Sequence, residues 1–270
     1  MIEIEPHAYT WKPDAFAATT LAATGLLYAI GWWRLFRRRA APPRLELAAF
    51  AIGWLTLVLA LLSPIATMSE WLFSVHMTQH ELLMLVAAPL LAIGRPLVPM
   101  MFALPERPRL ALSTGLSGRA LRLASAPLPV FLLHAIALWV WHIPLLYEAA
   151  VLDDRIHLIQ HVFFTATATL FWWGMIRGRY GRTGYGAAFL YIFATAVHSG
   201  GLGALLAFSD RAWYSLYVRR AIHGDAVSDQ QLGGLIMWVP SGVVLMLFGL
   251  AMFAAWLGEA ERRRQRGWSR

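Results

Sequence analysis

The chain has 270 residues, of which 59% are hydrophobic and 14% are charged, and its formal net charge at pH 7 is +8. Soluble domains carry a charged share of roughly 25%, so this composition excludes an ordinary soluble protein and indicates a membrane protein. The sequence has no cysteine, which excludes a disulfide framework and a thiolate metal site. Any bound metal ion must therefore have histidine, methionine or carboxylate ligands.

Seven apolar stretches, each about 20 residues long, follow one another along the chain, and a helix of that length crosses about 30 Å of hydrocarbon. We predict an all-α fold in which residues 1–270 form one integral-membrane domain, a seven-transmembrane helix bundle. The predicted spans are approximately 15–35, 45–66, 71–93, 126–146, 156–176, 186–208 and 232–257. Because Glu3 and Glu5 precede the first stretch, which is too long for a cleavable signal, we expect it to remain in the mature protein.

Basic residues are concentrated after the odd-numbered spans. Eighteen of the 23 Lys and Arg residues follow spans one, three, five and seven, and the other five lie in the remaining connections. Since positive charge collects on the cytoplasmic side, we predict an amino terminus outside and a carboxy terminus in the cytoplasm. The arginines lie in short loops at the membrane boundaries, where they meet lipid headgroups, so we expect no nucleic-acid partner.

The pentad H-x-x-Q-H occurs twice, as HMTQH at 76–80 and as HLIQH at 157–161, each near the outer end of a predicted span. Residues four apart lie on one face of a helix, so each pentad presents two imidazoles to one point. Pro64 precedes the first pentad by 12 residues and Pro144 precedes the second by 13. We therefore expect two similar hairpins whose preceding helices bend at the prolines.

Five histidines fall within the outer third of the predicted membrane. At 1.5 Å per residue, His76 and His157 lie near the outer mouth, His142 lies about 6 Å inside, and His80 and His161 lie roughly 8–12 Å inside. One such histidine is explained equally well as an interface residue, but ionisable residues within spans usually face a bundle interior or a cavity. The five together predict a metal site, with the three inner rings as primary ligands and the two outer rings at its mouth.

Methionines near this site indicate which metal it would bind. Met77 and Met84 flank the first pentad, and Met237 lies roughly 8 Å inside span seven. Because imidazole combined with thioether favours copper, we predict Cu(I) in preference to Zn(II), with an affinity that falls below pH ~6.5 as imidazole is protonated. Gln79 and Gln160 either orient the ring nitrogens as second-shell groups or bond across helices.

Further polar residues extend or qualify this prediction. His134 and His198 lie about 15–18 Å below the outer surface, where they either continue a track of ligands or bond a neighbouring backbone. Asp229 stands at the outer start of span seven, where it either caps the helix or orients an imidazole.

HELLM at 80–84 lacks the second histidine of a zinc-protease helix, which excludes a protease. The glycines within 200–203 indicate close helix packing.

Four stretches together resemble a known family. They are HMTQHELLMLVAAPLLAIGRPL (76–97), WHIPLLYEAAVLDD (141–154), HLIQH (157–161) with the later Phe171-Trp172-Trp173, and SDQQLGGLIMWVPSG (228–242). In this order, and over about two-thirds of the chain, they resemble the polytopic CtaG-type cytochrome c oxidase assembly proteins. The positions that fall on the family's motifs are His76, His80, His142, His157, His161, Asp229, Gln230, Gln231, Met237 and Trp238.

The resemblance implies a multi-pass factor of the bacterial inner (plasma) membrane that is needed to form active haem–copper oxidase and is not itself an enzyme. It implies delivery of copper to the binuclear centre, with an oxidase subunit and an outer-face copper donor as partners, and a homodimer is compatible with the sequence. The single-span copper chaperone of the same name is excluded, because that protein has cysteine ligands and this chain has none.

Three other functions remain open at the level of the sequence. A b-type cytochrome would hold haem between histidines, but two histidines four residues apart are too close for separate haems. A copper transporter would need ligands across the whole membrane, and the inner half has few below His134 and His198. A purely structural scaffold for oxidase subunits would use the histidines for packing.

Overall fold

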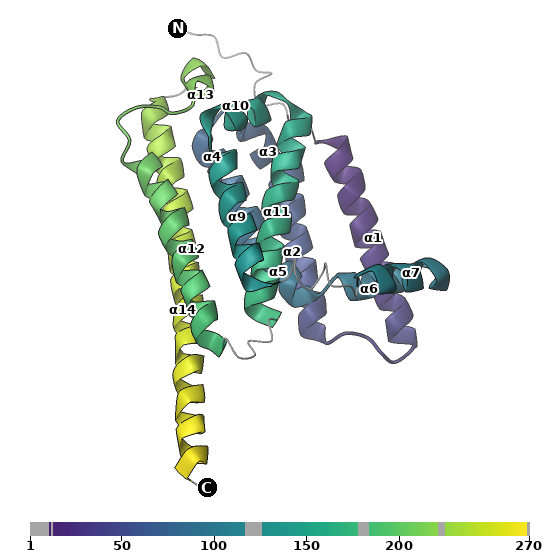
Figure 1. The fold of residues 1–270 in the computed structure, drawn as a ribbon. Coiled ribbons are helices and arrows are strands. Elements are labelled where there is room, and N and C mark those ends of the chain that lie inside the picture. The colour runs from purple at the N-terminus through teal and green to yellow at the C-terminus, as the bar shows by residue number, and fades with distance from the viewer. Residues whose placement is uncertain (1–10, 12, 117–125, 178–183, 221–224, 269–270) are drawn as a thin grey trace.

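The structure, a computed structural model, describes residues 11, 13–116, 126–177, 184–220 and 225–268, and within these ranges it contains helices and no strand (Figure 1). The helices are α1 (Ala15–Arg37), α2 (Arg44–Leu62), α3 (Pro64–Met68), α4 (Phe73–Glu81), the π-helix η2 (Leu82–Ala87), α5 (Ala88–Gly94), α6 (Leu97–Ala103), α7 (Glu106–Leu116), α9 (Pro127–Trp141), α10 (Pro144–Leu152), α11 (Asp154–Arg177), α12 (Gly184–Ala207), α13 (Ser215–Arg220) and α14 (Ala226–Trp268). The all-α prediction is therefore confirmed for the described residues.

Five helical stretches of the described chain are long and apolar enough to cross a membrane. They are α1, α2, the continuous run from α4 through η2 to α5, α12 and α14. If α9 and α10 together count as one span, the described chain has six candidate spans, although the two helices are bent by 76° at the break between them. The helix α11 has 24 residues, and its first two turns carry the polar second pentad. Seven spans and their orientation stay predictions.

The bundle has an apolar exterior and a partly polar interior. Large apolar side chains on its outside include Leu26, Ile52, Leu132, Val197 and Leu247, which are 45–62% exposed. Buried polar side chains include His76, Gln79, His80, Gln160 and Thr195. Lipid-exposed bundles need this arrangement, because hydrocarbon cannot satisfy polar groups. The chain is a multi-pass membrane protein.

Both pentads follow a short helix that starts at a proline, so the preceding helices break where the sequence predicted a bend. The predicted span 45–66 ends at Leu62, and α3 starts at Pro64. The predicted span 126–146 ends at Trp141, and α10 starts at Pro144. Proline lacks an N–H and restricts the residue before it to extended backbone, so it begins a new helix more readily than it continues one.

Glycines let α14 approach two other helices closely. A Cβ on Gly234 would lie 2.5 Å from the backbone nitrogen of Ala207 in α12, and one on Gly203 would lie 3.0 Å from the carbonyl oxygen of Gly234. A Cβ on Gly233 would lie 2.4 Å from the ring of Phe73 in α4. The packing role expected for 200–203 is thus confirmed for Gly203, whereas a Cβ on Gly201 would meet no heavy atom of the described chain within 4 Å, so Gly201 is not a contact point.

The short helices α6 and α7 lie across the bundle, away from the end that carries α10 and α13 (Figure 1). Arg34 of α1 donates from Nη1 to the carbonyl oxygens of Ala103, at 2.8 Å, and Phe102, at 3.1 Å. A Cβ on Gly31 would lie 1.7 Å from the Pro99 carbonyl oxygen, so only glycine permits this approach. This end of the bundle is therefore closed by backbone contacts, and the histidines lie at the other end.

Candidate functional site

The five histidines that the sequence predicts near one membrane face meet in one group, which we call the histidine cluster: His76, His80, His142, His157 and His161. Ring centres within the pentads are 4.3 Å apart for His76 and His80 and 4.2 Å apart for His157 and His161. Between helices, His76 lies 5.2 Å from His157, and His80 lies 5.6 Å from His161 and 6.3 Å from His142. The two pentads therefore face each other, as the sequence predicts.

Three elements supply these rings. The helix α4 carries His76 and His80, and α11 carries His157 and His161, each pair on one helix face. His142 is the C-cap residue of α9, at the break before Pro144, and so lies at a helix end, where a mid-helix position was expected. Four of the rings are buried and His157 is partly exposed. His76, which was expected at the mouth together with His157, is instead completely buried, because Tyr147 packs against its ring.

Every ring of the histidine cluster has at least one buried nitrogen with no hydrogen-bond partner. Both nitrogens of His76 and of His80 are in this state, as is Nε2 of the other three rings. The Ser69 backbone and the Gln160 amide lie near His76 without forming a well-aligned hydrogen bond. Buried polar atoms without partners are costly, so the cluster is suited to a ligand that accepts nitrogen lone pairs.

His142 shows which of its nitrogens is free to bind. Its Nδ1 lies 2.6 Å from the Leu138 carbonyl oxygen, and because a carbonyl can only accept, Nδ1 carries the proton and donates it. Nε2 then keeps its lone pair and has no partner. An outer hydrogen bond of this kind is how proteins fix the tautomer of a metal-binding histidine.

The distances between ring centres are close to those around a single metal ion, but the side chains are not arranged as ligands of one. With metal–nitrogen bonds of about 2.0 Å, ring centres around a tetrahedral ion lie about 5 Å apart, within the range seen between the pentads. Among the described residues, however, no group of three or more His, Cys, Asp or Glu side chains is placed so that it could hold a metal ion. To bind one ion the rings would have to rotate about their side-chain bonds, and pairs such as His80 and His142, with ring centres 6.3 Å apart, would have to draw closer.

Aromatic residues of α10 and of the 209–231 connection cover the histidine cluster. Tyr147 lies against His76, with ring centres 4.9 Å apart, and its hydroxyl is 3.2 Å from that of Tyr217 in α13. Tyr217 donates to the Ser69 carbonyl oxygen at 2.9 Å, and Tyr214 donates to the His142 carbonyl oxygen at 3.0 Å. Burial raises the pKa of the Tyr214 and Tyr217 phenols, so both stay protonated and keep donating.

The predicted second-shell residues act mainly on helix positions. Asp229 of α14 accepts from the backbone N–H groups of Phe73, at 2.6 Å, and Ser74, at 3.3 Å, so it caps α4. The expectation that it caps its own helix is wrong, since Asp225 accepts from Val227 there. Gln79 donates to the Ala60 carbonyl oxygen of α2 at 2.8 Å, which is the cross-helix alternative.

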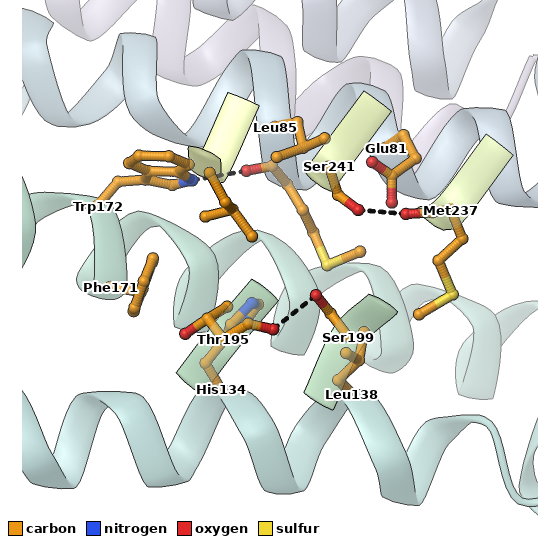
Figure 2. Close-up of a pocket in the computed structure, with 12 residues that line it drawn as sticks. Glu81, Leu85, His134, Leu138, Phe171, Trp172, Thr195, Ser199, Met237 and Ser241 are labelled. Atoms are coloured by element: carbon orange, nitrogen blue, oxygen red, sulfur yellow. Dashed lines mark hydrogen bonds between the residues drawn. The ribbon is translucent and has the colours of Figure 1, made fainter. Parts of the chain in front are cut away.

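A second predicted group, the methionines, lies elsewhere. A Cβ on Gly233 would lie 3.2 Å from Cγ of Met77, so Met77 packs toward α14. Met84 and Met237 line a separate interior cavity together with His134, whose Nδ1 is 3.1 Å from the Thr167 hydroxyl (Figure 2 shows the cavity). His134 therefore bonds a side chain where the sequence suggested a backbone group. His198 packs edge-on against Phe131, with ring centres 5.7 Å apart.

A cavity of about 600 Å³, which we call the outer cavity, lies between α1, α2 and α11 and reaches the histidine cluster. His157, His161 and Gln79 line its inner part, and Asp14 and Asp154 line it as well. Both carboxylates interact electrostatically with the His157 ring. A cation entering this space would meet negative charge first and imidazole next.

The sequence reasoning missed two groups of residues. The covering role of Tyr147, Tyr214 and Tyr217 was missed because Tyr147 and the other two lie about 70 residues apart in the chain, although the motif stretch 141–154 contains Tyr147. Glu81 also lines the interior cavity, and its Oε2 is buried without a partner. Its position directly after the first pentad was the available signal.

Comparison with known proteins decides the family. Residues 26–259 match the sequence profile of the cytochrome c oxidase caa3 assembly factors, Caa3_CtaG. The chain belongs to this family. Every member of the histidine cluster lies inside the matched region of this Caa3_CtaG protein, as do the covering tyrosines Tyr147, Tyr214 and Tyr217 and the capping Asp229.

Uncharacterized proteins of Mycobacterium leprae, Mycobacterium bovis and Mycobacterium tuberculosis are each 25% identical to the chain over 266 residues, with 93% of this chain covered. The chain spans 40% of the length of these curated relatives. No solved structure matches. The members of this family are described as assembly factors, which suggests a role without catalysis for this Caa3_CtaG chain.

Proposed function

We propose that this chain assembles cytochrome c oxidase by binding Cu(I) in the histidine cluster and handing it to the copper centre of the oxidase in the bacterial inner membrane. The observation that carries the proposal is the buried group of imidazole nitrogens without partners. A bare cluster of this kind is costly in a hydrocarbon environment, and a cation bound by the lone pairs offsets that cost. Copper is the cargo of the protein, taken up and released by exchange of ligands.

Two features favour a compact ion over haem. Ring centres only 4.2–4.3 Å apart within each pentad leave no room for a porphyrin between the two rings. The rings also come from three elements at one end of the bundle, whereas a bis-histidine haem needs one ring from each side. A visible spectrum of the purified protein with a strong Soret band would contradict this choice.

The proposed path begins in the outer cavity. Asp14 and Asp154 attract the cation, the partly exposed His157 receives it, and the buried rings of His80, His142 and His161 hold it. Release to an oxidase subunit requires the rings to turn back about their side-chain bonds. An outer-face copper donor and the oxidase subunit are the partners of this exchange.

The test compares histidine variants of the full chain for Cu(I) content after purification and for oxidase activity in a deletion strain. We expect His80→Ala and His161→Ala to lose the copper bound by the cluster and to abolish oxidase activity while the protein stays in the membrane. His76→Ala and His157→Ala should weaken loading. His198→Ala, a matched control outside the cluster, should retain both properties. Competition should show tighter binding of Cu(I) than of Zn(II).

If all five cluster variants keep full copper content and full oxidase activity, the histidines are packing groups and the proposal is wrong. If the variants lose activity but the wild-type protein binds no copper, the histidines serve assembly through another interaction, and copper delivery is wrong.

A further inference from the structure

The interior cavity has a volume of about 40 Å³ and lies among α4, η2, α9, α11, α12 and α14. Since a single water needs about 10–15 Å³ by this measure, the cavity has room for an ion. Its wall is lined by Glu81, Met84, Leu85, His134, Leu138, Phe171, Trp172, Thr195, Ser199, Met237, Ser241 and Leu245 (Figure 2). No Lys or Arg is among these lining residues, and Glu81 is the acidic side chain among them.

The hydrogen-bond donors of the wall are already used. Besides His134, four side chains with O–H or N–H groups line the cavity, and each donates to a backbone carbonyl oxygen. These donors are Thr195, Ser199, Ser241 and the indole of Trp172. Their oxygen lone pairs, the thioethers and the carboxylate are left as acceptors. A wall that offers acceptors and no free donor is matched to a cation.

His134 adds a nitrogen lone pair to this set. The Thr167 hydroxyl donates its single proton to the Phe163 carbonyl oxygen at 2.7 Å, so its oxygen accepts from Nδ1 of His134 at 3.1 Å. Nδ1 therefore carries the ring proton, and Nε2 keeps the lone pair that a metal ion would need. This is the same tautomer that the Leu138 carbonyl fixes in His142.

The backbone at the cavity is also irregular. Met84 lies in the π-helix η2, which interrupts the helical run from α4 to α5. The Met84 carbonyl oxygen accepts from Trp172 at 2.9 Å, so the irregular turn is held by a neighbouring helix. Single π-turns inside α-helices occur frequently at functional sites, because they shift side chains out of the regular helical positions.

We infer that the interior cavity is a second Cu(I) site. Its ligands are the thioethers of Met84 and Met237 and Nε2 of His134, a soft set that suits Cu(I) and not Zn(II). The Glu81 carboxyl, whose Oε2 has no partner, gives up its proton when the ion binds and so neutralises the single positive charge. The inference rests on the proposed function, because that function makes Cu(I) the cargo of the protein.

The two sites are adjacent in the structure. His80 belongs to the histidine cluster and its neighbour Glu81 to the interior cavity. Leu138 lines the cavity, and its carbonyl oxygen holds His142 of the cluster. Transfer of an ion from imidazole to thioether ligands would be an exchange of ligands between these two neighbouring segments, with no change in oxidation state.

The experiment measures Cu(I) equivalents and copper X-ray absorption on the purified full chain. We expect two equivalents for the wild type, with both nitrogen and sulfur scattering. The double variant Met84→Leu/Met237→Leu should retain one equivalent without sulfur scattering, and His80→Ala/His161→Ala should retain one with it. Glu81→Gln should weaken the sulfur-containing site about tenfold or more. Met175→Leu changes a buried methionine of α11 that lies outside the cavity lining and should alter nothing.

One equivalent that has nitrogen ligands alone, unchanged in Met84→Leu/Met237→Leu, would overturn the second site and leave the proposed function standing. One equivalent with sulfur scattering that is lost in both double variants would mean a single shared site, which also overturns the inference. A wild-type protein that binds no Cu(I) would overturn the inference and the proposed function together. Leucine matches methionine in volume, so the double variant is expected to fold.

Discussion

Replacing Asp229 by alanine tests how the outer end of α14 positions the first pentad. The carboxylate accepts from Phe73 at 2.6 Å and from Ser74 at 3.3 Å, at the N-terminus of the helix that carries His76 and His80. Loss of an N-cap costs about 0.5–2 kcal/mol, and a hydrogen bond to a charged group contributes about 1.5–3 kcal/mol. Because the hydrogen bond from Ser74 is long and the Asp229 side chain is only half-buried, we expect Asp229→Ala to lower the free energy of unfolding by about 2 kcal/mol.

The assay is unfolding of the purified protein in mixed micelles, followed by tryptophan fluorescence, together with its copper content. Asp229→Asn keeps one acceptor oxygen and should lose about half as much stability as Asp229→Ala. Asp225→Ala is the matched control, because Asp225 is exposed and accepts from Val227 at the start of its own helix. The Asp225→Ala variant should lose no more unfolding free energy than the loss of an ordinary N-cap costs, and its copper binding should be unchanged.

A stability for Asp229→Ala within about 0.5 kcal/mol of the wild type, the range of an ordinary surface substitution, would refute the capping argument. Equal effects of the Asp229 and Asp225 variants on copper content would refute the link between the cap and the histidine cluster.

Three other predictions follow from the packing and the charge distribution. Gly234→Ala places a Cβ 2.5 Å from the Ala207 nitrogen, so α12 and α14 must separate at a cost of about 1–3 kcal/mol in unfolding, whereas Gly201→Ala, with nothing within 4 Å, should cost nothing. Tyr217→Phe removes the proton donated to Ser69 and should lower stability by about 1–2 kcal/mol and speed copper exchange; unchanged exchange would contradict a covering role. A reporter fused to the carboxy terminus should be active in the cytoplasm, and activity on the outer face would reverse the predicted orientation.

The sequence alone determined the features that depend on neighbouring residues. Apolar stretches of helical length predict helices in a membrane, and the H-x-x-Q-H spacing places two imidazoles on one helix face. The prolines at 64 and 144 predict a bend before each pentad, and the structure has a break in the helix at both places. Depth along each helix follows from a fixed rise per residue, which is why the five rings that meet were expected at similar depths.

The tertiary structure decided which neighbour each helix face meets, because depth along a helix says nothing about the direction in which a side chain points. Met84 and Met237 were expected beside the histidine cluster, yet they face the interior cavity with His134. Asp229 lies in the first turn of α14, but its carboxylate accepts a hydrogen bond from the first residue of α4, Phe73. The close approach that Gly233 allows brings these two helices together. Contacts of this kind depend on how helices distant in the chain pack, and that packing is fixed only when all their faces are buried at once.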